Sequence, residues 1–449
     1  MDYQRYSLLQ EQFVTRYQKD LVRNIVLRLD TGFAAGGDDQ AFDSITGIPH
    51  IRPLNLTSDE ALTIEDTKYV PTDRPKTTDY IQKGEVLFNN TNSSIWVGKS
   101  VVFTEDYRAC CSNHITRLTI DLEKAVPQYI ADVFNLLRRK RLFEFYCVNF
   151  NNQAGINTEM LGELPIPLPP LNIQRALVAD LDHARTTRKA KLAEANALLT
   201  EMDAVVMREL GITVSSYEPT LAFGVRLGDA LKRLDVHYHQ PQYTQYSRRL
   251  DALTIPKLKI SQLSPQIIGG ATPERDNHNL YTTEGIKLLR IMNVAPYEID
   301  LTDVKYITED VHNRLLARSQ LRVGDILMTI TGRVGTCAVV TEDVLPANIN
   351  QHLVILRIDT RLCLTDYFVA YMNSEMGRAL SNRPTTGGTR IALDYQAIGN
   401  LEIPIPPLDI QQQLITELHT RRERARQLRQ EADKIWQEAQ ARFEQALIG

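Results

Sequence analysis

The polar residues of this 449-residue chain lack the spacings that well-known catalytic sites require. Gly98-Lys99-Ser100 resembles the end of a phosphate-binding loop, but that loop also needs a glycine where Ser93 stands. The sequence has no HExxH motif, no GxSxG motif and no GxGxxG after a predicted strand. Neither Pro-Pro pair precedes the aromatic residue that a base-flipping methyltransferase pocket would need. We therefore expect no catalytic residues, although a nuclease site, which is hard to see in one sequence, stays an alternative.

The histidines and cysteines do not predict a metal site. His237 and His239 are the closest histidine pair, and such a pair alone is a weak metal signal. The five cysteines are odd in number and show no CxxC spacing, which argues against a disulfide framework and a zinc cluster. Cys110 and Cys111 are best explained as small residues in or beside a strand. We expect no metal and no cofactor to be bound by this chain.

Two segments in the second half have residues suited to contacting DNA bases, at positions 331–335 and 385–390. Glycine lets a backbone approach DNA closely, and arginine is the side chain that most often contacts guanine. Tight turns with a solvated arginine would look the same in sequence, so that alternative stays open. The candidate DNA-binding residues in this half are Thr331, Arg333, Thr386, Gly388, Thr389 and Arg390.

The first half offers amides, which can pair with adenine, in residues 89–94 and 151–153. Polar turns without a DNA contact would have the same composition. The strongest basic run, residues 138–141, could contact phosphate or simply be a solvated helix end. The candidate DNA-binding residues in this half are Asn90, Asn92, Lys99, Asn152 and Gln153.

The overall charge limits how the chain could bind DNA. Its 51 basic and 55 acidic residues leave a net charge of −4, whereas a lone nucleic-acid-binding domain is often strongly basic. A basic surface must therefore be local, or a partner must supply it. The length suggests two to four domains. No apolar run approaches the roughly 18–20 residues that span a bilayer, and the first residues do not resemble a signal peptide, so we expect a cytoplasmic protein.

A proline-rich segment, which we name the proline motif, occurs twice. Residues 164–174 recur as residues 401–411, displaced by 237 positions. Further upstream, residues 83–88 resemble residues 323–328, displaced by 240. These matches predict two domains with a shared frame and different loops.

The start of the repeat is displaced differently. Residues 28–30 (Arg-Leu-Asp) resemble residues 233–235, displaced by only 205. On that alignment the second copy would carry roughly 35 extra residues early on.

Each copy combines short apolar runs with helical segments. β-branched runs broken by Gly, Pro and Asn are typical of strands. We expect strands at residues 288–294, 326–330, 338–341 and 353–358, and helices at residues 7–29 and 128–143.

A long helix follows each proline motif, over about residues 172–210 and 409–447. Asn172 and Asp409 are suitable N-caps, and neither segment contains Gly or Pro. Apolar positions alternate at spacings of four and three, the heptad pattern of a coiled coil. We expect the helices to pack on each other antiparallel, as a spacer roughly 58 Å long, although they could merely cap a core. The expected seam contains Leu177, Leu181, Leu198, Met202, Leu414, Leu418, Leu428 and Ile435.

The predicted fold is α+β: two mixed α/β domains separated by two long antiparallel helices that form a coiled coil, with a pseudo-twofold internal repeat. The predicted divisions are a first mixed domain at residues 1–170 and a central spacer helix at 171–211. A linker and second mixed domain at 212–407 precede a C-terminal spacer helix at 408–449.

This organisation resembles the specificity subunit of type I restriction-modification systems over the whole chain. The resemblance rests on the two proline motifs, each with the pattern Ile-Pro-x-Pro-Pro-Leu-x-x-Gln, and on two variable regions alternating with two similar helices. In the second half, residues 233–235 with Tyr238 and Pro241, 323–327 and 386–390 are also similar. The first half departs from the family at residues 151–155, where a Gly-rich turn with arginine would be typical.

The resemblance implies that each mixed region recognises one half of a bipartite, asymmetric site in double-stranded DNA. It implies that the helices set the gap between the halves and bind two methyltransferase subunits, which use S-adenosylmethionine to methylate adenine. Motor-nuclease (restriction) subunits, which use ATP and Mg, would join for restriction. This chain would be a non-catalytic subunit.

Two other classes of function remain as alternatives: a metal-dependent nuclease, and a coiled-coil scaffold whose globular ends bind proteins. A related complex with a different nuclease arrangement would use the same kind of subunit.

Overall fold

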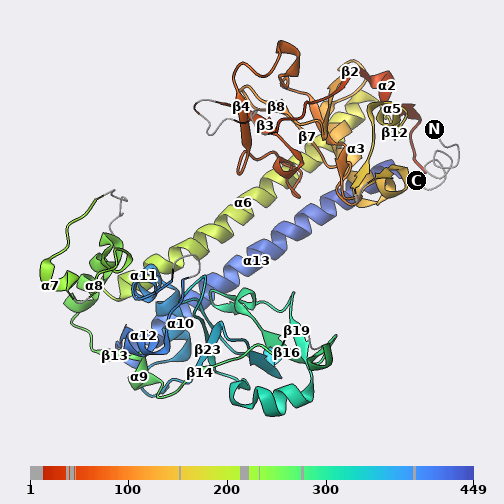
Figure 1. Cartoon of the computed structure of the whole chain (residues 1–449). Helices are drawn as coiled ribbons and strands as arrows, with labels where there is room; N and C mark the ends of the chain where they lie inside the picture. Colours follow the sequence, from red (N-terminus) through yellow and green to blue (C-terminus); the bar gives the residue numbers. More distant parts are fainter. Residues whose placement is uncertain are drawn as a thin grey trace. The chain divides into compact units, whose positions relative to one another are not determined.

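The computed structural model describes residues 14–36, 40, 45, 47–150, 153–212, 222–231, 233–274, 278–387 and 391–448 (Figure 1). The chain forms two compact units. Unit 1 comprises Met1–Leu192 and Arg429–Gly449, and unit 2 comprises Ala193–Leu428. Both units mix helices with sheets, as expected from the sequence. Among the described residues, no helix is both long and apolar enough to cross a membrane.

Unit 1 is built on a four-stranded antiparallel sheet in the order β2-β9-β5-β7. These strands are Val26–Thr31, Ile115–Ile120, Val86–Asn89 and Ser100–Val102. A three-stranded sheet has the order β4-β3-β8, namely Lys68–Pro71, Gly47–Ile51 and Cys110–Cys111. A two-stranded sheet pairs β1 (Lys19–Leu21) with β12 (Pro165–Pro167), and in a further three-stranded sheet β11 (Gln153–Gly155) pairs with both β10 (Val148–Phe150) and β6 (Thr91–Asn92).

The core of unit 1 lies between its main sheet and helix α3 (Pro127–Arg139). Aromatic rings of the sheet and the helices meet edge to face: the ring centroid of Phe88 in β5 lies 5.2 Å from that of Phe134 in α3 and 5.5 Å from that of Phe143 in α4 (Leu142–Tyr146). Shorter helices complete the unit: α2 (Val22–Ile25), α4 (Leu142–Tyr146) and α5 (Thr158–Gly162).

Unit 2 also has a four-stranded antiparallel sheet, in the order β14-β23-β20-β21. These strands are Ile267–Gly269, Leu353–Leu356, Ile326–Thr329 and Cys337–Val339. A second sheet has the order β15-β19-β16-β22, namely Tyr281–Thr282, Lys305–Ile307, Ile286–Leu289 and Ala347–Ile349. Two small sheets pair β17 (Val294–Ala295) with β18 (Glu298–Ile299), and β13 (Lys257–Lys259) with β24 (Glu402–Pro404).

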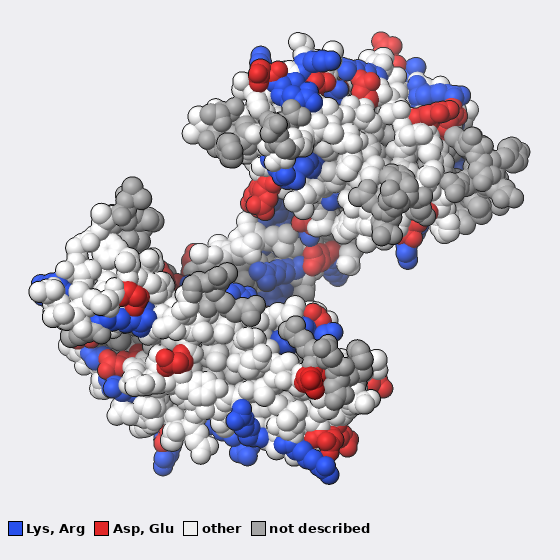
Figure 2. Space-filling model, viewed as in Figure 1, with Lys and Arg blue, Asp and Glu red and all other residues white. Residues whose placement is uncertain are grey.

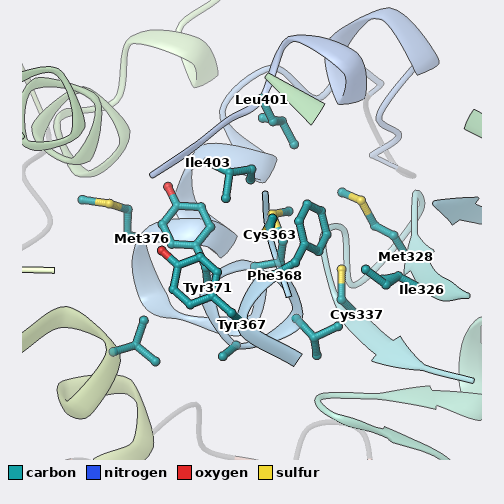
Figure 3. Packing of buried hydrophobic residues seen from close by; sticks show 14 of the residues in the cluster. Ile326, Met328, Cys337, Cys363, Tyr367, Phe368, Tyr371, Met376, Leu401 and Ile403 are labelled. Atoms are coloured by element: carbon teal, nitrogen blue, oxygen red, sulfur yellow. The ribbon is translucent and has the colours of Figure 1, made fainter. Parts of the chain in front are cut away.

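The core of unit 2 surrounds α10, whose buried aromatic residues Tyr367, Phe368 and Tyr371 lie among the side chains of the neighbouring elements (Figure 3). The helices of this unit, besides the long ones, are α7 (Leu227–Ala230), α8 (Pro241–Ala252), α9 (Ile260–Leu263), α10 (Thr365–Asn373), α11 (Glu375–Asn382) and α12 (Tyr395–Asn400).

The two units share one sheet topology. The pair β1-β12 corresponds to β13-β24, and the order β2-β9-β5-β7 corresponds to β14-β23-β20-β21. The three strands β4-β3-β8 correspond to β19-β16-β22, and in each set one neighbour is antiparallel and the other parallel. The shared frame that the sequence predicted therefore extends to the pairing of strands.

The structure corrects the alignment at the start of the repeat. Lys19 pairs with Pro167 and Lys257 pairs with Pro404, so the first strands are displaced by 238 residues. Arg28 lies in β2, whereas Arg233 precedes β13 and does not correspond to it. The displacement of 205, with roughly 35 extra residues inside the second copy, was wrong. A short Arg-Leu-Asp match occurs easily by chance, and strand pairing sets the true register.

Two expected helices were wrong in part. Residues 7–13 lie outside the described residues, but 19–21 and 26–31 are strands that pair with β12 and β9, leaving only α2 helical. Pairing with distant strands here overrides local helical periodicity. The expected helix at 128–143 is interrupted, because Arg141 has a left-handed backbone (φ 59°) between α3 and α4. Of the expected strands, 288–294 is also broken, by a 3₁₀ turn at Ile291–Asn293.

The long helices are α6 (Leu171–Glu209) and α13 (Leu408–Leu447). In unit 1, Asp180 pairs with Arg442 at 2.9 Å and Arg188 with Asp433 at 3.4 Å. Numbers that rise along α6 therefore fall along α13, which makes these segments antiparallel. The coiled coil and the pseudo-twofold relation stay predictions.

The helix segments of unit 2 are paired in the same sense. Glu201 pairs with Arg421 at 2.8 Å and Arg208 with Glu417 at 3.1 Å. Of the expected seam residues in the two units, Leu181, Met202, Leu414, Leu418 and Leu428 are buried, and Leu177, Leu198 and Ile435 are partly buried.

Candidate nucleic-acid interface

In each unit, a loop at the end of the main sheet is closed by a glycine. Loop 90–99 joins β5 to β7, and loop 330–336 joins β20 to β21. Gly98 donates its N–H to Asn89 O, and Gly335 donates to Thr329 O, both at 2.9 Å. Both glycines have positive φ (91° and 84°), a conformation that other residues rarely adopt. The two loops are therefore the same turn with different lengths and side chains.

A second segment pairs with each of these loops. In unit 1, β11 pairs with β6, which lies inside loop 90–99, and Ile156 N–H donates to Asn90 O at 2.9 Å. In unit 2, Ala392 bridges to Thr331, and Leu393 N–H donates to Ile330 O at 2.9 Å. In unit 1 the residues that pair with the loop are Ala154, Gly155 and Ile156, which directly follow the segment 151–153 singled out in the sequence, and in unit 2 Ala392 bridges to both Thr331 and Thr386.

At the far end of each loop, the side chain of a buried asparagine bonds to main-chain atoms of the next strand. Asn135 on α3 accepts from Ser100 N at 3.1 Å and donates to Ser100 O at 2.8 Å. Asn373 on α10 makes the same two bonds to Cys337, at 3.0 and 2.8 Å. The first residue of the strand after each loop is therefore fixed to a buried helix.

In unit 2, Arg333 is the candidate best placed for a DNA contact. It is exposed, and its Nη2 donates one long hydrogen bond, 3.4 Å, to Val294 O. Thr331 is half-buried with its Oγ1 3.1 Å from His352 Nδ1. Thr386 is exposed, while its backbone pairs with Ala392. The remaining candidates of this unit, Gly388, Thr389 and Arg390, lie outside the described residues.

In unit 1, the candidate Asn90 has a structural role. Its buried side-chain Nδ2 donates to Thr116 Oγ1 at 2.9 Å and to Asn113 O at 3.2 Å, and its side-chain Oδ1 accepts from Thr91 Oγ1. These bonds occupy the groups that adenine would need, so we assign Asn90 no base contact. Asn92 is half-buried and accepts from Ser93 N. Asn152, and the side chain of Gln153, lie outside what the structure describes.

Lys99 is buried beside an aromatic ring. Its Nζ lies 5.0 Å from the centroid of Trp96, and the guanidinium of Arg138 lies 5.8 Å from the same centroid. Burial, together with the positive charge of Arg138, lowers the pKa of Lys99 to about 8. Trp96 was not among the sequence candidates, because a single tryptophan in a polar segment does not indicate where its ring lies.

The basic run at 138–141 is neutralised by acidic partners. Arg138 and Arg139 both pair with Glu60, Lys140 pairs with Glu444, and Arg141 donates to Glu144 at 2.7 Å. Basic and acidic side chains are also interspersed on the visible face of each unit (Figure 2).

The segment around Tyr238, noted in the sequence for its motif, contacts residues 383–385 of unit 2, at the start of the second candidate segment. The guanidiniums of Arg233 and Arg383 lie 4.8 and 4.2 Å from the centroid of the Tyr238 ring. Arg233 also donates to Pro384 O at 3.1 Å and to Thr385 O at 2.9 Å. Arg383 and these contacts were missed, because the contacts join residues about 150 positions apart.

Within the ranges that the structure describes, no group of three or more His, Cys, Asp or Glu is arranged to hold a metal ion. All five cysteines are buried, and burial raises the pKa of Cys110, Cys111 and Cys363 to about 12.

Comparison with known proteins adds an independent observation. Residues 311–430 match the family described as "Type I restriction modification DNA specificity domain". Over 265 residues, the chain is 22% identical to the type I restriction enzyme EcoBI specificity subunit of Escherichia coli, covering 58% of this chain and 52% of that subunit. A putative type I restriction enzyme MjaX specificity subunit of Methanocaldococcus jannaschii is 27% identical over 104 residues, 22% of this chain and 24% of that one. The chain thus spans about half of the first relative and about a quarter of the second.

A solved structure shows the same fold. It comes from work on complex assembly and conformational transition of the type I R-M system, and it matches with a TM-score of 0.53 at 15% identity, over 96% of each chain. Together, these matches confirm the resemblance that the proline motifs indicated.

Proposed function

We propose that this chain, as a member of the type I restriction-modification specificity-subunit family, recognises DNA sequence for an assembly whose other subunits methylate and cleave. The observation that carries the proposal is the pair of closed turns. One frame occurs twice, with the same glycine closure and the same asparagine support, but it holds a ten-residue loop in unit 1 and a seven-residue loop in unit 2. A fixed frame with different exposed loops is suited to recognising two different targets.

Each unit would recognise one half of a bipartite, asymmetric site in double-stranded DNA. In unit 2, Arg333 has a guanidinium suited to a bidentate contact with guanine in the major groove. In unit 1, the half-buried Asn92 would offer its amide, and Lys99, which is buried against Trp96, would contribute positive charge beside the loop. Because the net charge is −4, partner subunits would supply part of the phosphate contacts.

The long helices would serve the assembly rather than the DNA contact itself. Antiparallel packing of α6 and α13 would form the spacer that sets the gap between half-sites, and the helices would bind two methyltransferase subunits. Those subunits would use S-adenosylmethionine to methylate adenine, and motor-nuclease subunits would use ATP and Mg. This chain would be a non-catalytic subunit that acts on cytoplasmic DNA.

The test is to co-express the chain with the methyltransferase encoded beside it, in a host that lacks adenine methylation, and to map methylated adenines across the genome. We expect one bipartite motif with a fixed gap. The matched control is the methyltransferase alone, which should leave no motif.

A stable complex that directs no methylation would favour the protein scaffold instead. Cleavage of DNA by the purified chain with a divalent metal would favour the nuclease.

A further inference from the structure

Each unit has a non-glycine residue with a left-handed backbone at the tip of a hairpin, and an arginine of a long helix contacts it. In unit 1 the tip residue is Glu60 (φ 62°) and the arginine is Arg185 of α6. In unit 2 the tip residue is Tyr297 (φ 67°) and the arginine is Arg422 of α13. Both members of the pair are displaced by 237 residues, the same displacement as the proline motif. We name each arginine with its tip residue a latch.

The latch of unit 2 joins the helix to both the ring and the backbone of the tip residue. The guanidinium of Arg422 lies 5.3 Å from the centroid of the Tyr297 ring, and its Nη2 donates to Tyr297 O at 3.1 Å. A left-handed backbone is uncommon for a bulky residue and persists where surrounding contacts hold it. Arg422 provides two such contacts.

The latch of unit 1 uses ion pairing in place of the aromatic contact. The side chain of Glu60 is only 3% exposed, and its Oε2 lies 3.7 Å from Arg185 Nη2. Arg138 and Arg139 pair with the same carboxylate. The guanidinium of Arg185 also lies 5.2 Å from the centroid of the Trp436 ring. The chemistry differs from unit 2, but the two positions that meet are the same.

Both latches are connected to the loops of the candidate interface. In unit 2, Tyr297 N–H donates to Cys337 O at 3.1 Å, at the end of loop 330–336, and Arg333 donates to Val294 O in the same hairpin. In unit 1, Arg138, which pairs with Glu60, lies against the ring of Trp96 in loop 90–99. The arginine of the long helix is thus linked to the loop region through Tyr297 in unit 2, and through Glu60 and Arg138 in unit 1.

We propose that Arg185 and Arg422 are positioning residues, which hold the DNA-contacting loop of their own unit in one orientation on the long helix. The proposal rests on the proposed function, because it concerns how sharply each unit discriminates between bases. Two different chemistries at one repeated position argue that the connection itself, rather than a particular bond, is what the fold retains.

The test compares methylation directed by wild-type chain and by Arg422→Ala in the co-expression assay. The half of the motif assigned to unit 2 is first identified as the half that changes in Arg333→Ala. In Arg422→Ala, the preference for matched over mismatched sites in that half should fall by about tenfold, the effect of losing a cation–π contact and a hydrogen bond. Preference in the other half should not change. Arg185→Ala should show the reverse pattern.

The matched control is Arg426→Ala, which removes the same charge from α13 but breaks an ion pair with Glu423 on the same helix. Two substitutions of Tyr297 distinguish a positioning role from a role in folding. Tyr297→Phe keeps the ring and should retain the preference. Tyr297→Gly keeps the left-handed backbone and the carbonyl acceptor but loses the ring, and should lose preference in the same half without loss of protein.

Three results would overturn the latch: an unchanged preference in Arg422→Ala, an equal fall in both halves, or an equal fall in Arg426→Ala. These outcomes leave the wild-type motif in place, so the proposed function would stand. If wild-type chain directed no motif, the proposed function would fail, and the latch would fail with it.

Discussion

Replacing Gln411 with alanine tests why the proline motif ends in glutamine. The side chain of Gln411 is fully buried at the start of α13. Its amide oxygen accepts from Leu364 N at 2.8 Å, and its Nε2 donates to Pro406 O at 2.8 Å and to Leu362 O at 3.1 Å. One side chain therefore ties the start of α13 to the residues that precede α10.

The expected loss follows from these three bonds. Each net hydrogen bond contributes about 1 kcal/mol, and a buried N–H left without a partner costs about 1–3 kcal/mol. Alanine removes all three bonds and leaves the Leu364 N–H without its acceptor, while the two carbonyls have a second lone pair to use elsewhere. The two bonds donated by Nε2 account for about 2 kcal/mol, and the Leu364 N–H left without a partner accounts for about 1–3 kcal/mol. We therefore expect Gln411→Ala to lower the free energy of unfolding of unit 2 by roughly 3–5 kcal/mol.

Urea unfolding followed by circular dichroism measures this loss from the shift in midpoint, provided that the slope stays the same. The matched control is Gln412→Ala, because Gln412 is the next residue on the helix and is exposed. The control should change the free energy of unfolding by less than about 0.5 kcal/mol. A difference below about 1 kcal/mol between the two variants would refute the reasoning from burial and bonding.

Two further predictions concern DNA binding. Arg333→Ala should weaken binding to the target by about 1–3 kcal/mol and spare scrambled DNA, because Arg333 is exposed and makes one long internal bond. Fluorescence anisotropy with both duplexes measures this, and an equal loss on both would make Arg333 a phosphate contact. Between about pH 7 and pH 9, target binding should weaken as Lys99, with its pKa of about 8, loses its charge, and Lys99→Arg should remove that dependence. The pKa of Lys99 is lower in the folded protein than the ordinary value of 10.5, so its contribution to stability rises with pH from about 8 to 10.5. Unfolding caused by the titration of Lys99 therefore cannot account for weaker DNA binding as the pH rises. Identical pH profiles would exclude Lys99 from the contact.

The sequence predicted what depends on local pattern and on exact recurrence. Pro-Pro pairs followed by uninterrupted helical segments predicted α6 and α13, and the repeated proline motif predicted a repeated frame. Segments rich in Asn, Gly and Arg were singled out in both halves, and in unit 2 Ala392 bridges to Thr331 of one segment and to Thr386 of the other.

Features that depend on long-range pairing were missed or wrong. Residues 7–29 were expected to be helical, but residues 19–21 pair with β12 and β2, which begins at Val26, pairs with β9. The burial of Asn90 could not be anticipated, because the partner hydroxyl of Thr116 lies 26 residues away. Nor does any local pattern indicate that Glu60 and Tyr297, two unlike residues, would share a left-handed backbone.

The supports of the repeated frame explain how loops can differ while the frame does not. The side-chain amides of Gln174 and Gln411 hydrogen-bond to main-chain atoms. The hydroxyl of Tyr129 also donates to a main-chain atom, Pro167 O, at 2.8 Å. The side-chain amide of Asn135 likewise bonds to the main-chain N–H and carbonyl oxygen of Ser100. Because a main-chain atom is present whatever the side chain, Cys can stand in unit 2 where Ser stands in unit 1. Loop residues are thereby free to diverge without loss of the support beneath them, as the proposed recognition of two different half-sites would require.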